Sequence, residues 1–221
     1  MKIFIIGITG GVGRLVARKL VEQGDQVGGL VRSASRSEEL AHEGISTTSG
    51  DLVTMSVEEL ASALRGSEAI VFTAGAGGRD GPNATDQVDG DGPAKLAAAA
   101  NLAGVRRLLL ISVFPEAWRE RRMDADFEHY MVAKKRAETQ LVLTDLDWLV
   151  LRPSALTNEP GTGRIDLGLA KIHNEITRDD VAATLVEALR QPEINRVILE
   201  LTGGSTPIQK AVAAMKPRNT A

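Results

Sequence analysis

The stretch Lys2-Ile-Phe-Ile-Ile-Gly-Ile-Thr-Gly-Gly-Val-Gly13 joins an apolar run to a glycine-rich turn. The apolar run predicts a fully buried strand over residues 2–6, because glycine bounds it at once. Residues 11–23 predict a helix, because apolar residues recur there on one helical face: Val12, Leu15, Val16 and Leu20. The glycine-rich turn therefore connects a buried strand directly to a helix.

Three spaced glycines, Gly7-x-x-Gly10-x-x-Gly13, make up this turn. Glycine permits unusual backbone angles, and the missing Cβ lets a pyrophosphate approach the N-terminus of the helix. In a strand–turn–helix context the motif predicts a dinucleotide-binding turn, with the alternative that the glycines serve only a tight turn. The residues expected to bind the cofactor here are Gly7, Thr9, Gly10, Gly11, Val12 and Gly13.

The rest of the chain continues to alternate strand and helix. Strands are predicted at residues 26–32, 45–49, 68–74, 105–112, 146–152 and 197–201. Helices are predicted at residues 36–43, 56–64, 84–103, 125–143 and 178–190, and a last short helix is expected to start at 205–207. Residues 154–177 are expected to form a connection rich in Gly, Pro and Thr.

This alternation predicts an α/β fold, a Rossmann-like doubly wound parallel sheet with helices on both faces and a short C-terminal extension. We expect residues 1–221 to form a single NAD(P)-binding domain, with substrate-side loops and elements mainly in residues 153–221. No composition shift or linker suggests a second domain.

Composition and charge narrow the classes of function. The 221 residues are 43% hydrophobic and 25% charged, which excludes a wholly disordered chain. The net charge of −3 gives no support for a nucleic-acid partner or a membrane surface. Cysteine is absent, which excludes disulfides and a thiolate nucleophile and fits a reducing cytosol. The apolar run after Lys2 is too short for an export signal, so we expect a cytoplasmic protein and, with scattered histidines, no metal site.

The ends of the next strands predict which dinucleotide is bound. Arg32 and Ser33 stand where an acidic residue would bind the ribose of NAD, and arginine is a bidentate phosphate binder. NADP(H) is therefore preferred and NAD(H) possible, with a solvated surface arginine as the alternative. Asp51 and Leu52 follow the third strand, where the aspartate either meets the adenine or is only a turn residue. The backbone of Thr73, Ala74 and Gly75 is expected to pass close to the cofactor.

Together these motifs resemble the short-chain dehydrogenase/reductase superfamily, in its atypical extended branch of small NAD(P)H-binding, epimerase/dehydratase-like proteins. The resemblance covers nearly the whole chain. The residues that carry it are Gly7-x-x-Gly10-x-x-Gly13, Val31-Arg32, Gly50-Asp51-Leu52, Ala103 to Arg107, Ser112, Tyr130-x-x-x-Lys134, Leu151-Arg152-Pro153 and Leu156 to Gly163.

The resemblance implies a catalytic set of Ser112, Tyr130 and Lys134. Tyr130 would exchange a proton with the substrate oxygen, Lys134 would bind the nicotinamide ribose, and Ser112 would position the carbonyl. A lysine ammonium four residues along a helix is expected to lower the pKa of the phenol. The alternative is a buried helix tyrosine beside a lysine that only binds ribose. The resemblance also implies that Pro153, Ser154 and Leu156 line the nicotinamide.

One departure from the superfamily pattern concerns the fourth helix. Some branches have an asparagine near its start, whereas this chain has Asp86, Asp89 and Asp91. This departure puts an asparagine-held relay water in doubt.

The sequence favours an NADP(H)-dependent oxidoreductase that acts on an unidentified small molecule. Two alternatives stay open: an NADPH-binding sensor without catalysis, with loops 76–92 and 114–126 as partner surfaces, and an NAD-dependent epimerase or dehydratase. The sequence determines neither the substrate nor the oligomeric state.

Overall fold

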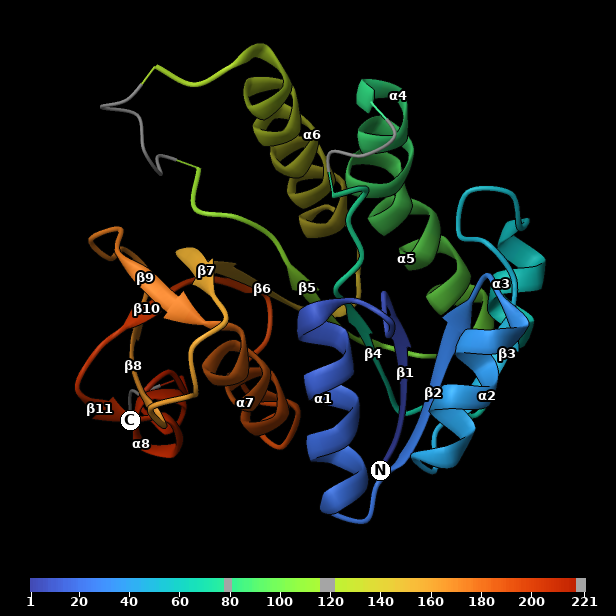
Figure 1. Cartoon of the computed structure of the whole chain (residues 1–221), viewed down its shortest axis with the longest axis horizontal. Helices are drawn as coiled ribbons and strands as arrows, with labels where there is room; N and C mark the ends of the chain where they lie inside the picture. The colour runs from blue at the N-terminus through green and yellow to red at the C-terminus, as the bar shows by residue number, and fades with distance from the viewer. Residues whose placement is uncertain (78–80, 116–121, 218–221) are drawn as a thin grey trace.

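A central sheet organises the computed structural model, which describes residues 1–77, 81–115 and 122–217 (Figure 1). Its strands are β1 (Lys2–Ile6), β2 (Gln26–Val31), β3 (Ser46–Ser49), β4 (Ala69–Phe72), β5 (Arg107–Ile111), β6 (Asp147–Pro153), β8 (Arg164–Gly168), β10 (Val197–Gly203) and β11 (Thr206–Pro207). They lie in the order β11-β8-β10-β6-β5-β4-β1-β2-β3. A separate parallel pair is formed by β7 (Ala155–Thr157) and β9 (Glu175–Thr177).

Neighbouring strands from β3 to β10 run parallel. At the far edge β8 runs antiparallel to β10, and β11 antiparallel to β8. The strand order reverses between β1 and β4, and in open α/β sheets ligands bind at such a reversal, beyond the carboxyl ends of the strands. The Rossmann-like fold that the sequence predicted is therefore confirmed.

Helices cover both faces of this sheet. On one face lie α1 (Gly11–Glu22), α2 (Ala34–His42), α7 (Arg178–Leu189) and α8 (Ile208–Ala213). On the other lie α3 (Val57–Leu64), α5 (Gly92–Ala103) and α6 (Ala125–Val142). The alternation of β1 explains the two layers, because Ile3 and Ile5 belong to the first core whereas Phe4 and Ile6 belong to the second.

Three segments differ from the sequence predictions. The predicted helix 84–103 is built from α4 (Gly81–Thr85), a wide π-turn η1 (Asp86–Asp91) and α5. The predicted connection 154–177 contains the short strands β7, β8 and β9. Thr206–Pro207 pairs as β11, and the last helix begins one residue later, at Ile208. Unlike β1, β4 and β5, these short strands contain no continuous apolar run, and they are too short for an alternating pattern to identify them. Parts of the two predicted partner loops, 78–80 and 116–121, lie outside the described residues.

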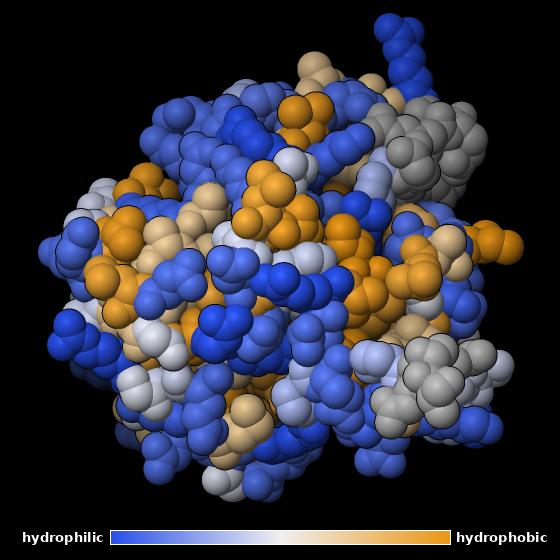
Figure 2. All heavy atoms as spheres, turned by 180° about the vertical axis from the view of Figure 1, so that it is seen from behind, coloured by the Kyte–Doolittle hydropathy of each residue, from blue (hydrophilic) through white to orange (hydrophobic). Residues whose placement is uncertain are grey.

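The described surface carries single exposed apolar side chains. Figure 2 shows that on the face seen from behind they are interspersed with hydrophilic residues, which is ordinary for folded proteins. The large ones include Leu102, Val132, Leu143, Leu169 and Ile172. Of the helices in the described ranges, none has the length and apolar character needed to cross a bilayer.

The close packing of α1 against the glycine turn makes a prediction about stability. A Cβ at Gly13 would collide with the Gly7 carbonyl oxygen and lie 2.6 Å from Thr73 Oγ1. We expect Gly13→Ala to lower the free energy of unfolding by about 3 kcal/mol, because backbone cannot yield as a flexible side chain does. Denaturant unfolding followed by circular dichroism measures this loss.

Gly104→Ala is the matched control. Gly104 has a φ of 74°, and a Cβ there would meet nothing within 4 Å. Its loss should therefore be only about 1 kcal/mol, the conformational cost of the left-handed region. Equal losses in the two variants would contradict the steric explanation for Gly13.

Candidate functional site

One groove runs across the carboxyl ends of the central strands. It consists of two adjoining clefts of about 440 Å³ and about 660 Å³. The smaller cleft lies beyond the ends of β1, β2 and β4, and the larger extends past β5 to α6. Both are lined by Thr73, Ala74 and Gly75 just after β4, so the two clefts adjoin at the end of this strand. The groove therefore occupies the position that the strand order predicts for a ligand.

The glycine turn forms the wall between these clefts and α1. Gly7 has a φ of 88°, and a Cβ there would lie 2.5 Å from the backbone nitrogen of Ala74. Thr73 Oγ1 donates to the Ile6 carbonyl at 3.1 Å, and the Gly10 amide donates to the Gly7 carbonyl at 2.9 Å. The turn and the end of β4 thus touch through backbone atoms, which leaves space above them for a ligand.

The N-terminus of α1 has no side-chain cap, and neither has that of α5, which continues directly from η1. Side chains of Ser33, Ser56, Asp124 and Thr177 accept backbone N–H groups at the starts of α2, α3, α6 and α7. By contrast, α1 begins after Gly10 with no side-chain cap. Its first N–H groups and the positive end of its dipole face the groove, and this is an anion-binding arrangement that fits a pyrophosphate.

Arg32 stands at the outer end of the smaller cleft. Its side chain is 78% exposed, and its only ion pair among the described residues is a loose one, with Nη1 3.7 Å from Asp51 Oδ2. Asp51 acts as a turn residue, because its Oδ1 accepts the Val53 amide at 2.7 Å. Leu52 lines the same cleft, whereas Ser33 caps α2 by accepting the Arg36 amide and does not line it. An adenine contact for Asp51 stays a prediction.

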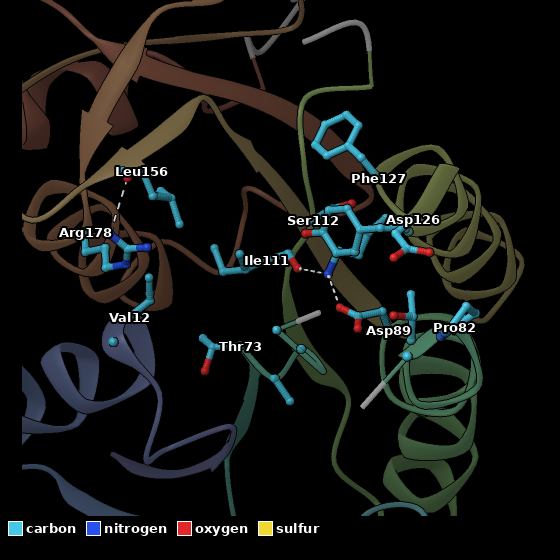
Figure 3. A pocket seen from close by; sticks show the side chains of 18 residues that line it. Val12, Thr73, Pro82, Asp89, Ile111, Ser112, Asp126, Phe127, Leu156 and Arg178 are labelled. Carbon is cyan, nitrogen blue, oxygen red and sulfur yellow. Dashed lines mark hydrogen bonds and ion pairs between the residues drawn. The ribbon is translucent and has the colours of Figure 1, made fainter. Parts of the chain in front are cut away.

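Ser112, Tyr130 and Lys134 all line the larger cleft, and their catalytic roles stay a prediction. Ser112 follows β5 (Figure 3), and the other two residues are four positions apart on α6 and so lie about one turn from each other. Lys134 is buried, and its Nζ donates to the Ile111 carbonyl at 2.9 Å. Ser112 Oγ is buried and has no hydrogen-bond partner within the part of the chain that the structure describes. A buried hydroxyl without a partner at the edge of a cleft fits a site for a ligand oxygen or amide.

Asp89, which the sequence did not single out as a site residue, lies under this group. The π-turn η1 directs it into the cleft, where it is 1% exposed and its Oδ2 accepts the Ala76 amide at 2.9 Å. Its Oδ1 lies 3.8 Å from Lys134 Nζ (Figure 3). Burial raises the pKa of Asp89 and lowers the pKa of Lys134, while the opposite charge of each partner opposes its shift.

The prediction that Lys134 lowers the pKa of Tyr130 is wrong. Burial of the phenol away from water and, secondarily, the negative charge of Asp89 raise the pKa of Tyr130 above its ordinary value. The ammonium of Lys134 is committed to Ile111 and Asp89. Tyr130 is a neutral phenol at physiological pH, as an ordinary tyrosine is, and the raised pKa makes it a weaker acid.

The segment after β6 contributes less than the sequence predicted. Leu156 lines the larger cleft. Pro153 is buried in β6, and Ser154 Oγ accepts the Asn174 amide at 3.2 Å. Neither residue is among the described residues that line the two clefts. Arg178, at the start of α7, does line the larger cleft, although no motif in the sequence marked it.

Comparisons with known proteins support dinucleotide binding by this chain. The family model described as NAD(P)H-binding matches residues 7–192. The uncharacterized sugar epimerase YhfK of Bacillus subtilis strain 168 is 35% identical over 213 residues, which cover 96% of this chain and 99% of YhfK.

Two solved structures are also similar. The candidate NAD-dependent epimerase/dehydratase of Bacillus halodurans is 28% identical and has a TM-score of 0.87, covering 97% of this chain and 99% of that one. The oxidoreductase ylbE of Lactococcus lactis is 30% identical and has a TM-score of 0.83, covering 97% of this chain and 96% of that one.

The effect of Asp89 on the phenol makes a prediction about ionisation. Tyr130 is the single tyrosine of the chain, so ultraviolet phenolate absorbance reports it alone. Phenolate should form above the ordinary pH of about 10. Asp89→Asn should move this titration downward by about 1 pH unit, because a negative charge that disfavours phenolate is removed.

The control for this titration is Asp126→Asn, which alters a carboxylate that lines the same cleft but does not raise the pKa of Tyr130. Its titration should match the wild type. Far-ultraviolet circular dichroism at each pH verifies that the chain is folded. Identical titrations in the wild type and Asp89→Asn would show that Asp89 has no effect on the phenol.

Proposed function

Because the chain belongs to the NAD(P)H-binding family, in its atypical short-chain dehydrogenase/reductase and epimerase-like branch, we propose that it is an NADP(H)-dependent oxidoreductase acting on a small molecule. The observation that carries the proposal is a groove of two adjoining clefts, with an exposed arginine in one and a serine–tyrosine–lysine group in the other. A dinucleotide is the elongated ligand whose two ends match these groups.

The outer end of the groove supports a preference for NADP(H). Arg32 follows β2 directly, where a ribose 2′-phosphate would lie, and its guanidinium has only the 3.7 Å contact with Asp51 among the described residues. A guanidinium can bind a phosphate through two parallel hydrogen bonds. The side chain also keeps 78% of its surface exposed, so it can reach the phosphate without breaking a buried contact.

The inner end supports a reaction at a carbonyl-type carbon. A bound nicotinamide supplies or accepts the hydride. Tyr130 would exchange the proton at the substrate oxygen, and Ser112 Oγ would donate a hydrogen bond to that oxygen. Lys134 would hold the nicotinamide ribose, and its fixed position follows from the Ile111 carbonyl and Asp89. Tyr130 is protonated at physiological pH, which is the form that can give a proton to a carbonyl oxygen during reduction, and its raised pKa makes it a weaker acid than an ordinary phenol.

An NAD-dependent epimerase is the second candidate, because the similar proteins of the two Bacillus species are named as an epimerase and an epimerase/dehydratase. Two features weigh against it. Arg32 favours a phosphorylated ribose. Residues 155–213 mostly extend the sheet and one helical layer beside it, which leaves little chain for a separate domain that would bind a nucleotide sugar. A purified protein that carries stoichiometric NAD would favour the epimerase.

Calorimetric titration tests the cofactor preference. Wild-type protein should bind NADPH at least tenfold more tightly than NADH, a difference of about 1.4 kcal/mol. Arg32→Ala should abolish the difference by weakening only NADPH. The control Arg106→Ala removes an arginine that is 62% exposed and loosely paired with an aspartate at 3.3 Å, and it should leave both affinities unchanged. A preference for NADH, or one that persists in Arg32→Ala, would contradict the role of Arg32.

Tyr130→Phe tests the proton transfer. On a carbonyl substrate found by NADPH oxidation across aldehydes, ketones and quinones, kcat should fall about 10²- to 10⁴-fold. The affinity for NADPH should stay the same, because the substitution removes only the hydroxyl. Unchanged turnover would refute proton transfer by Tyr130. Tight NADPH binding without turnover on any compound would favour a regulatory protein that senses the cofactor.

A further inference from the structure

Arg178 is the first residue of α7, and two contacts fix its backbone beside the glycine turn. Thr177 caps the helix by accepting the Asp180 amide at 2.9 Å. Lys19 of α1 pairs with Asp179 at 2.8 Å, which ties the start of α7 to α1. Arg178 therefore projects from a rigid helix end and not from a loop.

The side chain of Arg178 passes over Gly11. A Cβ at Gly11 would lie 3.0 Å from Arg178 Cδ and 3.2 Å from Arg178 Nε. Gly11 is not one of the three spaced glycines, and it does not have a positive φ. A Cβ at Gly11 would therefore require the Arg178 side chain to shift by a few tenths of an ångström. Gly11 and Arg178 both line the larger cleft, and Figure 3 shows Arg178 near Val12, so the arginine lies at the groove beside the uncapped start of α1.

Neutral acceptors hold one nitrogen of the guanidinium. Arg178 Nη1 donates to Asn158 Oδ1 at 2.8 Å and to the Leu156 carbonyl at 3.3 Å. No carboxylate in residues 1–77, 81–115 and 122–217 forms an ion pair with Arg178, although many other arginines in those ranges have such a partner. A guanidinium has five N–H donors, so charge and donors remain for an anion.

From this geometry we propose that Arg178 binds the pyrophosphate of the dinucleotide. The N–H groups at the start of α1 contact the pyrophosphate from one helix, and the guanidinium contacts it from α7, with a full positive charge that the glycine turn itself lacks. Asn158 and the Leu156 carbonyl are positioning groups that hold the guanidinium. The inference rests on the proposed function, because it needs a dinucleotide in the groove.

Calorimetric titration with three ligands, and with no substrate, tests the assignment. NADPH, NADH and ADP-ribose all contain the pyrophosphate, whereas only the first carries a 2′-phosphate and only the first two carry a nicotinamide. Arg178→Ala should weaken all three by the same factor, about tenfold to hundredfold, as expected for a lost hydrogen bond to a charged group. Arg178→Gln should behave similarly, because it keeps the length and polarity of the side chain but not its charge.

Arg164→Ala is the control. Arg164 lies on β8, its Nη1 donates to the Ser205 carbonyl at 2.6 Å, and it does not line the groove. It should leave all three affinities unchanged. Thermal melting verifies that each variant is folded, and Arg178→Gln carries the test if Arg178→Ala does not fold.

Three results would overturn the assignment. Wild-type affinities in the folded variants would show that Arg178 does not bind the cofactor. A loss confined to NADPH would assign Arg178 to the 2′-phosphate, and a loss for NADPH and NADH but not ADP-ribose would assign it to the nicotinamide end. In each case wild-type binding and the Tyr130→Phe result stand, so the proposed function survives. Wild-type protein that binds none of the ligands would overturn both.

Discussion

The contact between Gly7, Gly13 and the end of β4 is the constraint on which the site depends. A Cβ at Gly7 would meet the backbone of Ala74, and one at Gly13 would meet the Gly7 carbonyl oxygen. The turn can therefore lie flat against β4, and α1 can begin immediately above it. This arrangement brings the uncapped N–H groups of α1 to the topological switch point between β1 and β4, where the groove crosses the sheet. Any side chain at these two positions would push α1 away and move its positive end out of the groove.

The inner end of the groove depends on a second constraint, the burial of Asp89 beside Lys134. Two opposite charges removed from water stabilise each other only when their remaining hydrogen-bonding atoms are satisfied. The Ala76 amide and the Ile111 carbonyl supply these partners, and in doing so they fix the backbone on both sides of the cleft. Burial and, secondarily, the negative charge of Asp89 raise the pKa of Tyr130. The same cleft thus contains a neutral phenol and the Ser112 hydroxyl, which has no hydrogen-bond partner among the described residues.

Local patterns in the sequence predict the parts of this structure that are themselves local. The buried strand β1, the glycine turn, and the pairing of Tyr130 with Lys134 on one helix face follow from spacing alone. The sequence could not reveal the π-turn at Asp86–Asp91, because its extra residue per turn disturbs the helical period only slightly, yet it is this turn that directs Asp89 into the cleft. The strands β7 and β9 have three residues each and show no period. The contact between Gly11 and Arg178 joins residues far apart in the chain, and no motif marks such a pair.

The position of Arg178 follows from the packing of the whole of α7 and not from the turn that precedes it. At its start α7 is tied to α1 by Lys19 and Asp179, and at its end Arg190 pairs with Asp25, just beyond α1. Between these ion pairs the two helices share the apolar core on one face of the sheet. A ligand that bridges the glycine turn and Arg178 therefore contacts two segments that are already held together by burial. Binding of such a ligand costs little conformational entropy, because the site is already ordered. Its binding free energy stabilises the folded protein relative to the unfolded chain. Folding and cofactor binding are therefore linked through α1 and α7. Arg178, the first residue of α7, completes a site that begins at Gly7 because the packing of these two helices brings the two segments together.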